Sequence, residues 1–577
     1  MSKVHSLLII ASLTCAVASL SGCKPTNKCS AASCNGCCSD LGQCLAGNAS
    51  NACGRGGATC KACGATELCV ATTGACTQGM TTGGGSSGTG GGTSGTGGGS
   101  SGTGGGTSGT GGGSGGGTVN PNDVEGTCTQ TYAFDTDGGT RPCQFGANTP
   151  SAVLIAEDGG LTTIVSAVRP DSSFTLANVP MGPYFLKLGT TWFKTSQRRV
   201  SLDYESLGRV DGAMAGTGTT LTVATTGMQA WDDLTHFMSL YSSNSGVAME
   251  AFSLYTTNAP LGGESAFDWR IPYDQYSTQL LTPMIDSTKG DTVMITQMES
   301  SSSGEYRTVA AGQGSSVAMV SGQVNPTTVA LMSPPASTTP LDVSVSSFSQ
   351  YTADFTTGTA PTLNLEFTTG PRPLHERASD GLAFVWGSYP QAGSTATPPN
   401  PLTYPNPFPA SWGTTVMIQY GGTVSRLMTG ASEARRYFSG ITTTIPIQAL
   451  ASPIAAAISP PKDVQLNGMP FANAQTTVTR TPTITWGAPT LGTVSRYLVR
   501  VEQLQLSSGR TTSRVAGTFY LLPTDTSFTI PTNVLLAGQS YVVTLSAYKL
   551  STNLERDLSD FRFPISSATV VSGIVKP

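Results

Sequence analysis

A run of 45 residues made almost entirely of glycine, serine and threonine, at positions 79–123, divides this chain into two unlike parts. Of the 70 glycines in the 577 residues, 22 lie between Gly83 and Gly117. A seven-residue unit starts at Ser86 and recurs, with Ser or Thr in first place, at Thr93, Ser100 and Thr107. No side chain here can build a core, and glycine loses the most backbone entropy on ordering. We therefore expect a flexible, disordered linker.

The N-terminus predicts export. Lys3 precedes a mostly apolar run, Leu7–Leu20, which is too short to span a membrane and is typical of a signal peptide. The run closes in Leu20-Ser21-Gly22-Cys23, which resembles the lipobox of bacterial lipoproteins. The resemblance implies that residues 1–22 are removed, that Cys23 is acylated, and that acyl chains bind the protein to a membrane. Lys24 follows in place of the aspartate that marks inner-membrane retention, which favours the outer membrane or cell surface. An ordinary signal peptide is the alternative.

Residues 23–78 form a cysteine-rich module with few large apolar side chains. About 50 residues with so little to bury need covalent cross-links to hold a fold. Without Cys15 in the signal peptide and the acylated Cys23, 12 of the 14 cysteines remain, which is an even number that fits disulfides in an oxidising compartment. The candidates are Cys29, Cys34, Cys37, Cys38, Cys44, Cys53, Cys60, Cys63, Cys69, Cys76, Cys128 and Cys143.

A zinc site is the alternative use of these cysteines. Cys34-x-x-Cys37 and Cys60-x-x-Cys63 have the inner spacing of a zinc ribbon. Six further cysteines surround these four, the module has no histidine, and the chain is expected to be exported. Disulfides are therefore favoured, the pairing among the ten cysteines of the module stays open, and we expect no metal.

The distal part predicts an all-β, multidomain fold of antiparallel β-sandwiches. Helix signals are scarce, and short runs of alternating apolar and polar residues are separated by Gly, Pro, Asn and Ser. These expected strands include Leu221–Val223, Val293–Thr296, Leu341–Val345, Leu363–Phe367 and Val416–Tyr420.

Residues 124–210 resemble the carboxypeptidase regulatory-like, prealbumin-like sandwich. The resemblance rests on Phe174-Thr175-Leu176 followed by Val179-Pro180-Met181-Gly182-Pro183-Tyr184-Phe185-Leu186. We expect a hairpin in which Phe174, Leu176, Tyr184 and Leu186 all point inward. The family's module is a structural accessory without catalytic residues. Cys128 and Cys143 are expected to pair locally.

Residues 458–577 resemble a fibronectin type III domain. Trp486 follows an alternating run, and Leu535-x-x-Gly538-x-x-Tyr541-x-Val543-x-Leu545 closes the pattern. The resemblance implies that Trp486 is a buried core residue of the second strand and that Tyr541 forms the tyrosine corner.

Residues 211–457 read as one or two β-rich domains of unknown family. Their best acid–base cluster is Asp232, Asp233 and His236, and a second comprises His375, Glu376, Arg377 and Asp380. Glu264 and Asp268 are paired carboxylates of the kind used by glycosidases. None follows a known catalytic motif, and a lone histidine near an aspartate is more often structural.

Two groups of aromatic residues in this region suit either sugar stacking or core packing. The first group is Trp269, Tyr273 and Tyr276, and the second is Tyr404, Phe408 and Trp412. Aromatic residues make up only 7% of the chain, so the cores must claim most of them. Core packing is therefore favoured.

Charge and histidine content exclude several functions. Charged residues are 11% of the chain, the net charge is −4, and only three histidines occur, which is evidence against a nucleic-acid partner and against a histidine-rich active site. We assign no catalytic residue and expect no cofactor, and an enzymatic activity stays open but is less favoured. The leading hypothesis is a lipid-anchored envelope or surface protein with a non-enzymatic binding or structural role and an envelope or extracellular protein or glycan as ligand. The alternatives are an exported hydrolase acting on polysaccharide or peptide through 211–457, and a subunit of a larger surface assembly.

Overall fold

The computed structural model describes two separate units, and nearly all of the regular secondary structure in the described residues is β-strand. It describes residues 34, 37–38, 44–45, 48–49, 52–61, 63, 67–70, 75–78 and 120–577, without 134–138, 147, 157–158, 255, 257, 274–282, 357, 372–381, 395–396, 477, 553–556 and 560. The expected signal peptide, Cys23, Cys29 and nearly all of residues 79–123 lie outside the described residues. Within the described part of the chain, no helix has the length and apolar character needed to cross a membrane.

The cysteine-rich unit is built from two- to four-residue strands joined by disulfides. Three pairs are described: Cys37–Cys60, Cys53–Cys69 and Cys63–Cys76. Cys34 and Cys38 are disulfide-bonded as well. The strands are β1 (Cys37–Cys38), β2 (Cys44–Leu45), β3 (Asn48–Ala49), β4 (Ala52–Cys53), β5 (Ala58–Thr59), β6 (Glu67–Val70) and β7 (Ala75–Gln78).

The first sandwich of the distal unit, here called sandwich 1, begins at Val124. Sheet β13-β14-β8-β17 faces strands β12-β11-β15-β16, and a small sheet β10-β9-β18 adjoins them. The strands are β8 (Val124–Thr127), β9 (Thr129–Ala133), β10 (Thr140–Pro142), β11 (Ser151–Ile155), β12 (Leu161–Val165), β13 (Ala167–Val168), β14 (Phe174–Leu176), β15 (Tyr184–Leu188), β16 (Thr191–Thr195), β17 (Arg199–Ser201) and β18 (Tyr204–Leu207).

The expected inward direction of the four motif residues in sandwich 1 is confirmed, but the expected hairpin is wrong. Phe174, Leu176, Tyr184 and Leu186 are all 0–1% exposed. Strand β14 pairs with β13 and β8, whereas β15 pairs with β11 and β16. The chain therefore crosses from one sheet to the facing one between these strands, so all four side chains meet in the core from opposite sides.

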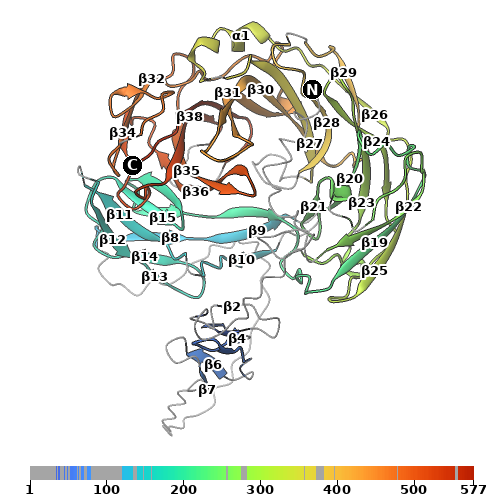
Figure 1. Ribbon diagram of the computed structural model, residues 1–577, viewed down its shortest axis with the longest axis horizontal. Coiled ribbons are helices and arrows are strands. Elements are labelled where there is room, and N and C mark those ends of the chain that lie inside the picture. Colours follow the sequence, from blue (N-terminus) through green and yellow to red (C-terminus); the bar gives the residue numbers. More distant parts are fainter. Residues whose placement is uncertain are drawn as a thin grey trace, which may run out of the picture. The chain divides into compact units, whose positions relative to one another are not determined.

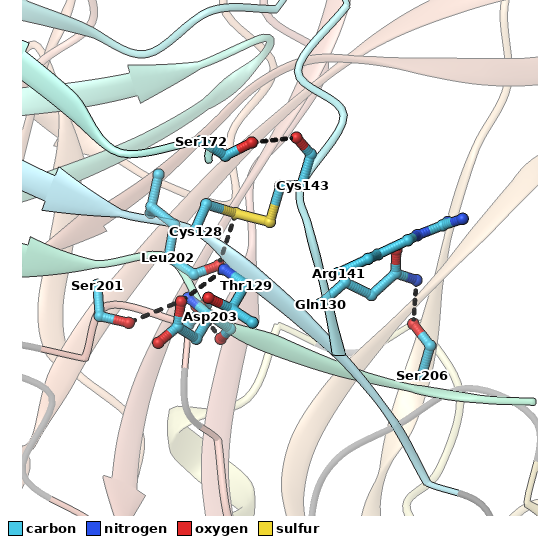
Figure 2. The surroundings of a disulfide bond; sticks show 11 residues. Cys128, Thr129, Gln130, Arg141, Cys143, Ser172, Ser201, Leu202, Asp203 and Ser206 are labelled. Atoms are coloured by element: carbon cyan, nitrogen blue, oxygen red, sulfur yellow. Dashed lines mark hydrogen bonds between the residues drawn. A yellow bond between two sulfur atoms is a disulfide. The ribbon is translucent and has the colours of Figure 1, made fainter. Parts of the chain in front are cut away.

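A disulfide fixes the entry of the chain into sandwich 1. Cys128 lies between β8 and β9, where the chain passes from one sheet to another, and it is bonded to Cys143 just after β10. Figure 2 shows the surrounding polar contacts, in which the Ser172 hydroxyl donates to the Cys143 carbonyl at 2.5 Å and the Thr129 amide donates to the Asp203 carboxylate at 2.6 Å. The local pairing expected from the sequence is what the structure shows.

Sandwich 2 places sheet β22-β19-β25 against strands β24-β23-β20-β21. Its core contains Trp269, Phe252 and Tyr273, each fully buried. The strands are β19 (Thr220–Thr226), β20 (His236–Ser242), β21 (Val247–Met249), β22 (Phe267–Pro272), β23 (Met294–Ser300), β24 (Glu305–Gln313) and β25 (Val324–Ala330), with short 3₁₀ turns η3 (Phe252–Leu254) and η4 (Ser287–Lys289).

Sandwich 3 covers strands β28-β27-β30-β31 with the two-stranded sheet β26-β29. Alternation in β27 explains its orientation, because Leu363, Leu365 and Phe367 are at most 4% exposed whereas Glu366 faces the other way. The elements are β26 (Ala336–Thr339), α1 (Val345–Ser349), η5 (Thr352–Asp354), β27 (Thr362–Gly370), β28 (Ala383–Ser388), β29 (Leu402–Pro405), β30 (Gly413–Arg426), β31 (Arg435–Pro446) and η7 (Ile447–Ala449).

Sandwich 4 has the arrangement expected of a fibronectin type III domain. Sheet β33-β32-β34-β37 faces β36-β35-β38-β39. Trp486 on β34 is 4% exposed and packs edge-on against Tyr497 at 5.2 Å between ring centroids, while the fully buried Tyr541 accepts a hydrogen bond from the Leu536 amide at 2.8 Å. The strands are β32 (Lys462–Leu466), β33 (Met469–Pro470), β34 (Thr483–Gly487), β35 (Arg496–Ser507), β36 (Arg510–Leu521), β37 (Ser527–Thr529), β38 (Ser540–Leu550) and β39 (Ile565–Val571).

The four sandwiches share one sheet of 16 strands, of which Figure 1 labels all but β16 and β39. Strand β16 of sandwich 1 pairs with β36 of sandwich 4, β39 pairs with β31 of sandwich 3, and β28 pairs with β24 of sandwich 2. The first junction is reinforced by the Trp192 and Phe519 rings, 5.3 Å apart, and by an ion pair from Lys194 to Asp525 at 2.6 Å. The sandwiches are therefore coupled edge to edge. The domain boundaries at 210 and 457 stay predictions.

One expected strand is wrong. Leu341–Val345 has the alternation of a strand, but Val345 begins helix α1 and Leu341 and Val343 lie in an irregular segment. Val343 forms only an isolated bridge to Ile454. The alternating apolar residues are still used for packing, since Leu341 is 1% exposed and Phe348 of α1 is fully buried in the same core. The apolar pattern thus identified buried positions but not the backbone conformation.

Candidate functional site

The acid–base cluster around His236 closes a turn. The Asp232 carboxylate accepts from the Leu234 amide at 2.8 Å, and the Asp232 amide donates to Nδ1 of His236 at 3.1 Å. Gln297 Nε2 lies 3.2 Å from the same ring nitrogen and Gln297 is fully buried. Two amide donors facing Nδ1 favour the neutral ring, and burial lowers the pKa of His236 further. The contact between Asp232 and His236 runs through the backbone, so the carboxylate does not orient the ring for proton transfer.

The paired carboxylates of the same region occupy different settings. Glu264 Oε2 accepts from the Leu261 amide at 2.9 Å and closes the turn at 261–264. Asp268 is exposed on β22, next to the fully buried Trp269. Glu264 thus has a local structural contact. His375, Glu376, Arg377 and Asp380, the second cluster, lie outside the described residues.

The described residues of the two aromatic groups pack in the cores of sandwiches 2 and 3 or against them. Trp269 and Tyr273 are fully buried in sandwich 2, and Tyr404 and Phe408 are 3% and 6% exposed in sandwich 3. Trp412 is half-buried and stacks on Phe408 with ring centroids 5.1 Å apart. The favoured use in cores is confirmed for these residues, and Tyr276 lies outside the described ones.

The described cysteines do not form the zinc site considered as an alternative, because they are paired in disulfides. Cys37 is bonded to Cys60 and Cys63 to Cys76, so the two Cys-x-x-Cys pairs do not form a set of four free thiolates. The sulfur atoms of Cys53, Cys63 and Cys69 do lie within 4.8 Å of one another. They are close because the Cys53–Cys69 and Cys63–Cys76 disulfides are neighbours, and a sulfur in a disulfide is not a thiolate ligand.

A cluster that the sequence analysis did not find lies where sandwich 2 meets sandwich 3. Glu366 on β27 is paired with Gly387 on β28, and Gly387 is paired with Tyr306 on β24. Paired residues of antiparallel strands project to the same face, so Glu366 and Tyr306 share one side of the sheet. A Cβ at Gly387 would lie 2.8 Å from the Tyr389 ring. The missing side chain therefore leaves room for this ring, whose hydroxyl donates to Glu366 at 2.6 Å.

Two carboxyl groups of this cluster have raised pKa values. Burial raises the pKa of Glu366, against the opposing effect of the Tyr389 hydrogen bond. Glu250, just after β21, is an exposed residue, and its partial desolvation by the surrounding protein, followed by the charge of Glu366, raises its pKa to about 7. The buried Tyr306 hydroxyl, whose ring packs edge-on against Tyr389, has no hydrogen-bond partner. Perturbed carboxylates gather at functional sites more often than elsewhere, although structural clusters produce them too.

No sequence signal brings these residues together. Glu250, Glu366 and Tyr389 are separated by 116 and 23 positions and come from two sandwiches. The alternation Leu363-Asn364-Leu365-Glu366-Phe367 shows only that Glu366 faces away from the core. The cluster depends on the pairing of β24 with β28, which links residues about 80 positions apart.

Comparisons with known proteins find only distant structural similarity. No protein-family model matches the chain, and no curated protein matches it either. Among solved structures, the FN1–FN3 domains of chicken CNTN1 align at 10% identity over 63% of this chain and 97% of that chain, with a TM-score of 0.12. A streptococcal ancillary pilin aligns at 9% identity over 55% and 95%, with a TM-score of 0.11.

Domains A168–A170 of titin give a similar result, with 11% identity over 64% of this chain and 94% of that chain and a TM-score of 0.12. Scores this low carry no argument about function. The class of protein defined by the strand pairing itself is an all-β chain of sandwiches, the last of them fibronectin type III-like.

Proposed function

We propose that this protein is a lipid-anchored component of the cell envelope or surface whose β-sandwiches have a non-enzymatic binding or structural role. The observation that carries the proposal is the shared 16-stranded sheet, because strand pairing between sandwiches holds four modules together as a scaffold. The lipobox-like segment ending in Cys23 supports the anchor. Disulfides in both units support an oxidising compartment.

The contacts of the candidate catalytic residues also support a non-enzymatic role. Asp232 and Glu264 accept hydrogen bonds from backbone amides of their own turns, and His236 is held by Gln297 and the Asp232 amide. Groups engaged in this way stabilise loops, and none of them forms the nucleophile–base contact that covalent catalysis requires.

Two experiments test the proposal. Cys23→Ala should move the protein from the membrane to the soluble fraction, and unchanged membrane association would refute the anchor. The chain from Lys24 to Pro577 is then presented to immobilised envelope glycans and envelope proteins, with each recovered ligand analysed by mass spectrometry. Retention of an intact ligand supports binding, whereas no retention together with hydrolysis of a glycan or peptide contradicts it.

A hydrolase remains the second candidate because of one observation, the raised pKa values of Glu250 and Glu366. A carboxyl group that keeps its proton near neutral pH is a feature of a general acid, and glycosidases use a pair of carboxyl groups. If this candidate is correct, hydrolysis of a polysaccharide or peptide panel by the wild-type chain is lost in Glu250→Gln and Glu366→Gln and kept in Glu264→Gln. No hydrolysis by the wild-type chain contradicts it.

A further inference from the structure

One end of sandwich 2 gathers several connecting loops. Strand β19 runs parallel to β25 and antiparallel to β22, so β19 and β25 end where β22 begins. The loop 227–235 leaves β19 at this end, and the loop 250–266 enters β22 there. The two loops are joined, because the Trp231 amide donates to the Glu264 carbonyl at 2.9 Å and the Gly263 amide donates to the Trp231 carbonyl at 2.8 Å.

Three leucines on these loops point into solvent, and we name them the leucine tip. Leu234, Leu254 and Leu261 are 75%, 60% and 74% exposed. Two of the leucines are held in place at the backbone, since the amides of Leu234 and Leu261 donate to the Asp232 and Glu264 carboxylates. The Met238 amide donates to the Ser253 hydroxyl at 3.0 Å, which holds η3 beside β20. Covering exposed leucines with a partner removes apolar surface from water, which stabilises the complex.

The leucine tip has an acidic rim. From Gly227 to Asp268 the sequence has no lysine or arginine, and the acidic residues Asp232, Asp233, Glu264 and Asp268 lie on the two loops or at the start of β22. Asp232, Asp233 and Asp268 are exposed beside the leucines, on the same loops or at the start of β22. A surface of this composition attracts positive charge and repels anionic groups.

We propose that the leucine tip binds a protein partner in which basic side chains flank exposed apolar ones. This inference rests on the proposed binding role and names its surface and the chemistry of its ligand. An anionic lipid surface would meet the acidic rim with like charge. A sugar would need an exposed aromatic ring to stack on, whereas Trp231 and Trp269 at this end are 7% and 0% exposed. The leucines supply apolar area and the carboxylates orient the partner.

The test uses the chain from Lys24 to Pro577 and three fluorescent peptides of equal length. One alternates leucine with lysine, one leucine with glutamate, and one serine with lysine. Fluorescence anisotropy should show binding of the leucine–lysine peptide at least about tenfold tighter than of the other two. Leu234→Ser combined with Leu261→Ser should weaken that binding by at least about tenfold. Leu506→Ser, a half-exposed leucine on β35, is the matched control and should change nothing.

A second variant tests the rim. Asp233→Asn combined with Asp268→Asn should weaken binding of the leucine–lysine peptide and reduce its dependence on salt, because fewer charges then face the lysines. Binding that is unchanged in both double variants overturns the inference, and so does equal binding of the serine–lysine peptide. Vesicles of phosphatidylglycerol serve as the membrane arm, and binding to them that is lost in the leucine double variant, without peptide binding, also overturns it.

The same samples separate this inference from the proposed function. Mass spectrometry of the peptides after incubation should show them intact. Cleaved peptide would contradict the non-enzymatic role, whereas intact peptide that does not bind would contradict only the assignment of the leucine tip.

Discussion

The cysteine-rich unit and the distal unit are held together by different forces. Three described disulfides join the strands of the former, none of which is longer than four residues. In the distal unit, strands of up to 14 residues enclose apolar cores, and the one disulfide that the structure describes there is Cys128–Cys143. A disulfide stabilises chiefly by restricting the unfolded chain, whereas a core stabilises by removing apolar surface from water. The two units should therefore respond to different perturbations.

Reduction of the disulfides should produce the largest difference in stability between the two units. With a reducing agent at pH 8, the cysteine-rich unit loses three described cross-links worth about 2–4 kcal/mol each and should unfold. The distal unit loses one such cross-link and should stay folded. Hydrogen exchange followed by mass spectrometry measures both in one sample, with the oxidised protein as control. Retained protection of residues 52–61 after reduction would show that the short strands do not need the disulfides.

Removal of a core side chain should destabilise the distal unit and leave the cysteine-rich unit unaffected. Trp269→Ala empties the centre of sandwich 2, where the indole is fully buried and donates to the Thr225 hydroxyl at 3.0 Å. The free energy of unfolding of the distal unit should fall by about 3–5 kcal/mol in urea titrations. Trp412→Ala is the control, because its half-buried ring should cost clearly less. Equal losses for the two variants would contradict the assignment of the core.

Sandwich 4 allows a finer test of what holds one module in shape. Tyr541→Phe keeps the buried ring but leaves the Leu536 amide without its acceptor, at a cost of about 1–3 kcal/mol. The change is measured by urea unfolding, with hydrogen exchange at Leu536 as a local reporter. Tyr548→Phe, on the same strand, provides the comparison. Unaltered exchange at Leu536 would mean that the tyrosine corner does not hold this loop.

The tyrosine corner and the motif of sandwich 1 show what the sequence makes predictable. Apolar alternation and a few spaced aromatic residues identify buried positions, and Phe174, Tyr184, Trp486 and Tyr541 are all buried as expected. The partner of each strand is less predictable, because alternation is the same whichever strand lies alongside. For this reason β14 and β15 were expected to form a hairpin but lie in facing sheets.

The junctions between sandwiches and the glutamate cluster were beyond prediction for the same reason. The pairing of β16 with β36 joins residues more than 300 positions apart, and no local pattern marks either strand as a partner of the other. Glu366 and Glu250 come together only through such a junction. Asp232, His236 and Glu264 were visible in the sequence because they are close along the chain, and the same closeness explains why they bond within their own turns.

The smallest expected effect concerns the carboxyl groups at the junction between sandwiches 2 and 3, because Glu250 is exposed and solvent screens its contribution to stability. Glu250 has its pKa raised from 4.5 to about 7 in the folded protein, with the pKa of Glu366 raised as well. A folded state with a raised carboxyl pKa binds the proton more tightly than the unfolded state does. The stabilisation is therefore complete below pH 4.5 and is lost as the pH rises through about 7.

We expect the urea midpoint of the distal unit to decline between pH 5 and pH 8, and Glu250→Gln to reduce that decline because the amide never ionises. Asp233→Asn is the matched control, as an exposed acidic residue of the same sandwich, and should keep the wild-type slope. A wild-type slope in Glu250→Gln would show that this carboxyl does not couple to folding. Since like charges at Glu250 and Glu366 repel, and these residues belong to the two sandwiches joined by the pairing of β24 with β28, a confirmed effect would mean that the coupling at this junction responds to pH.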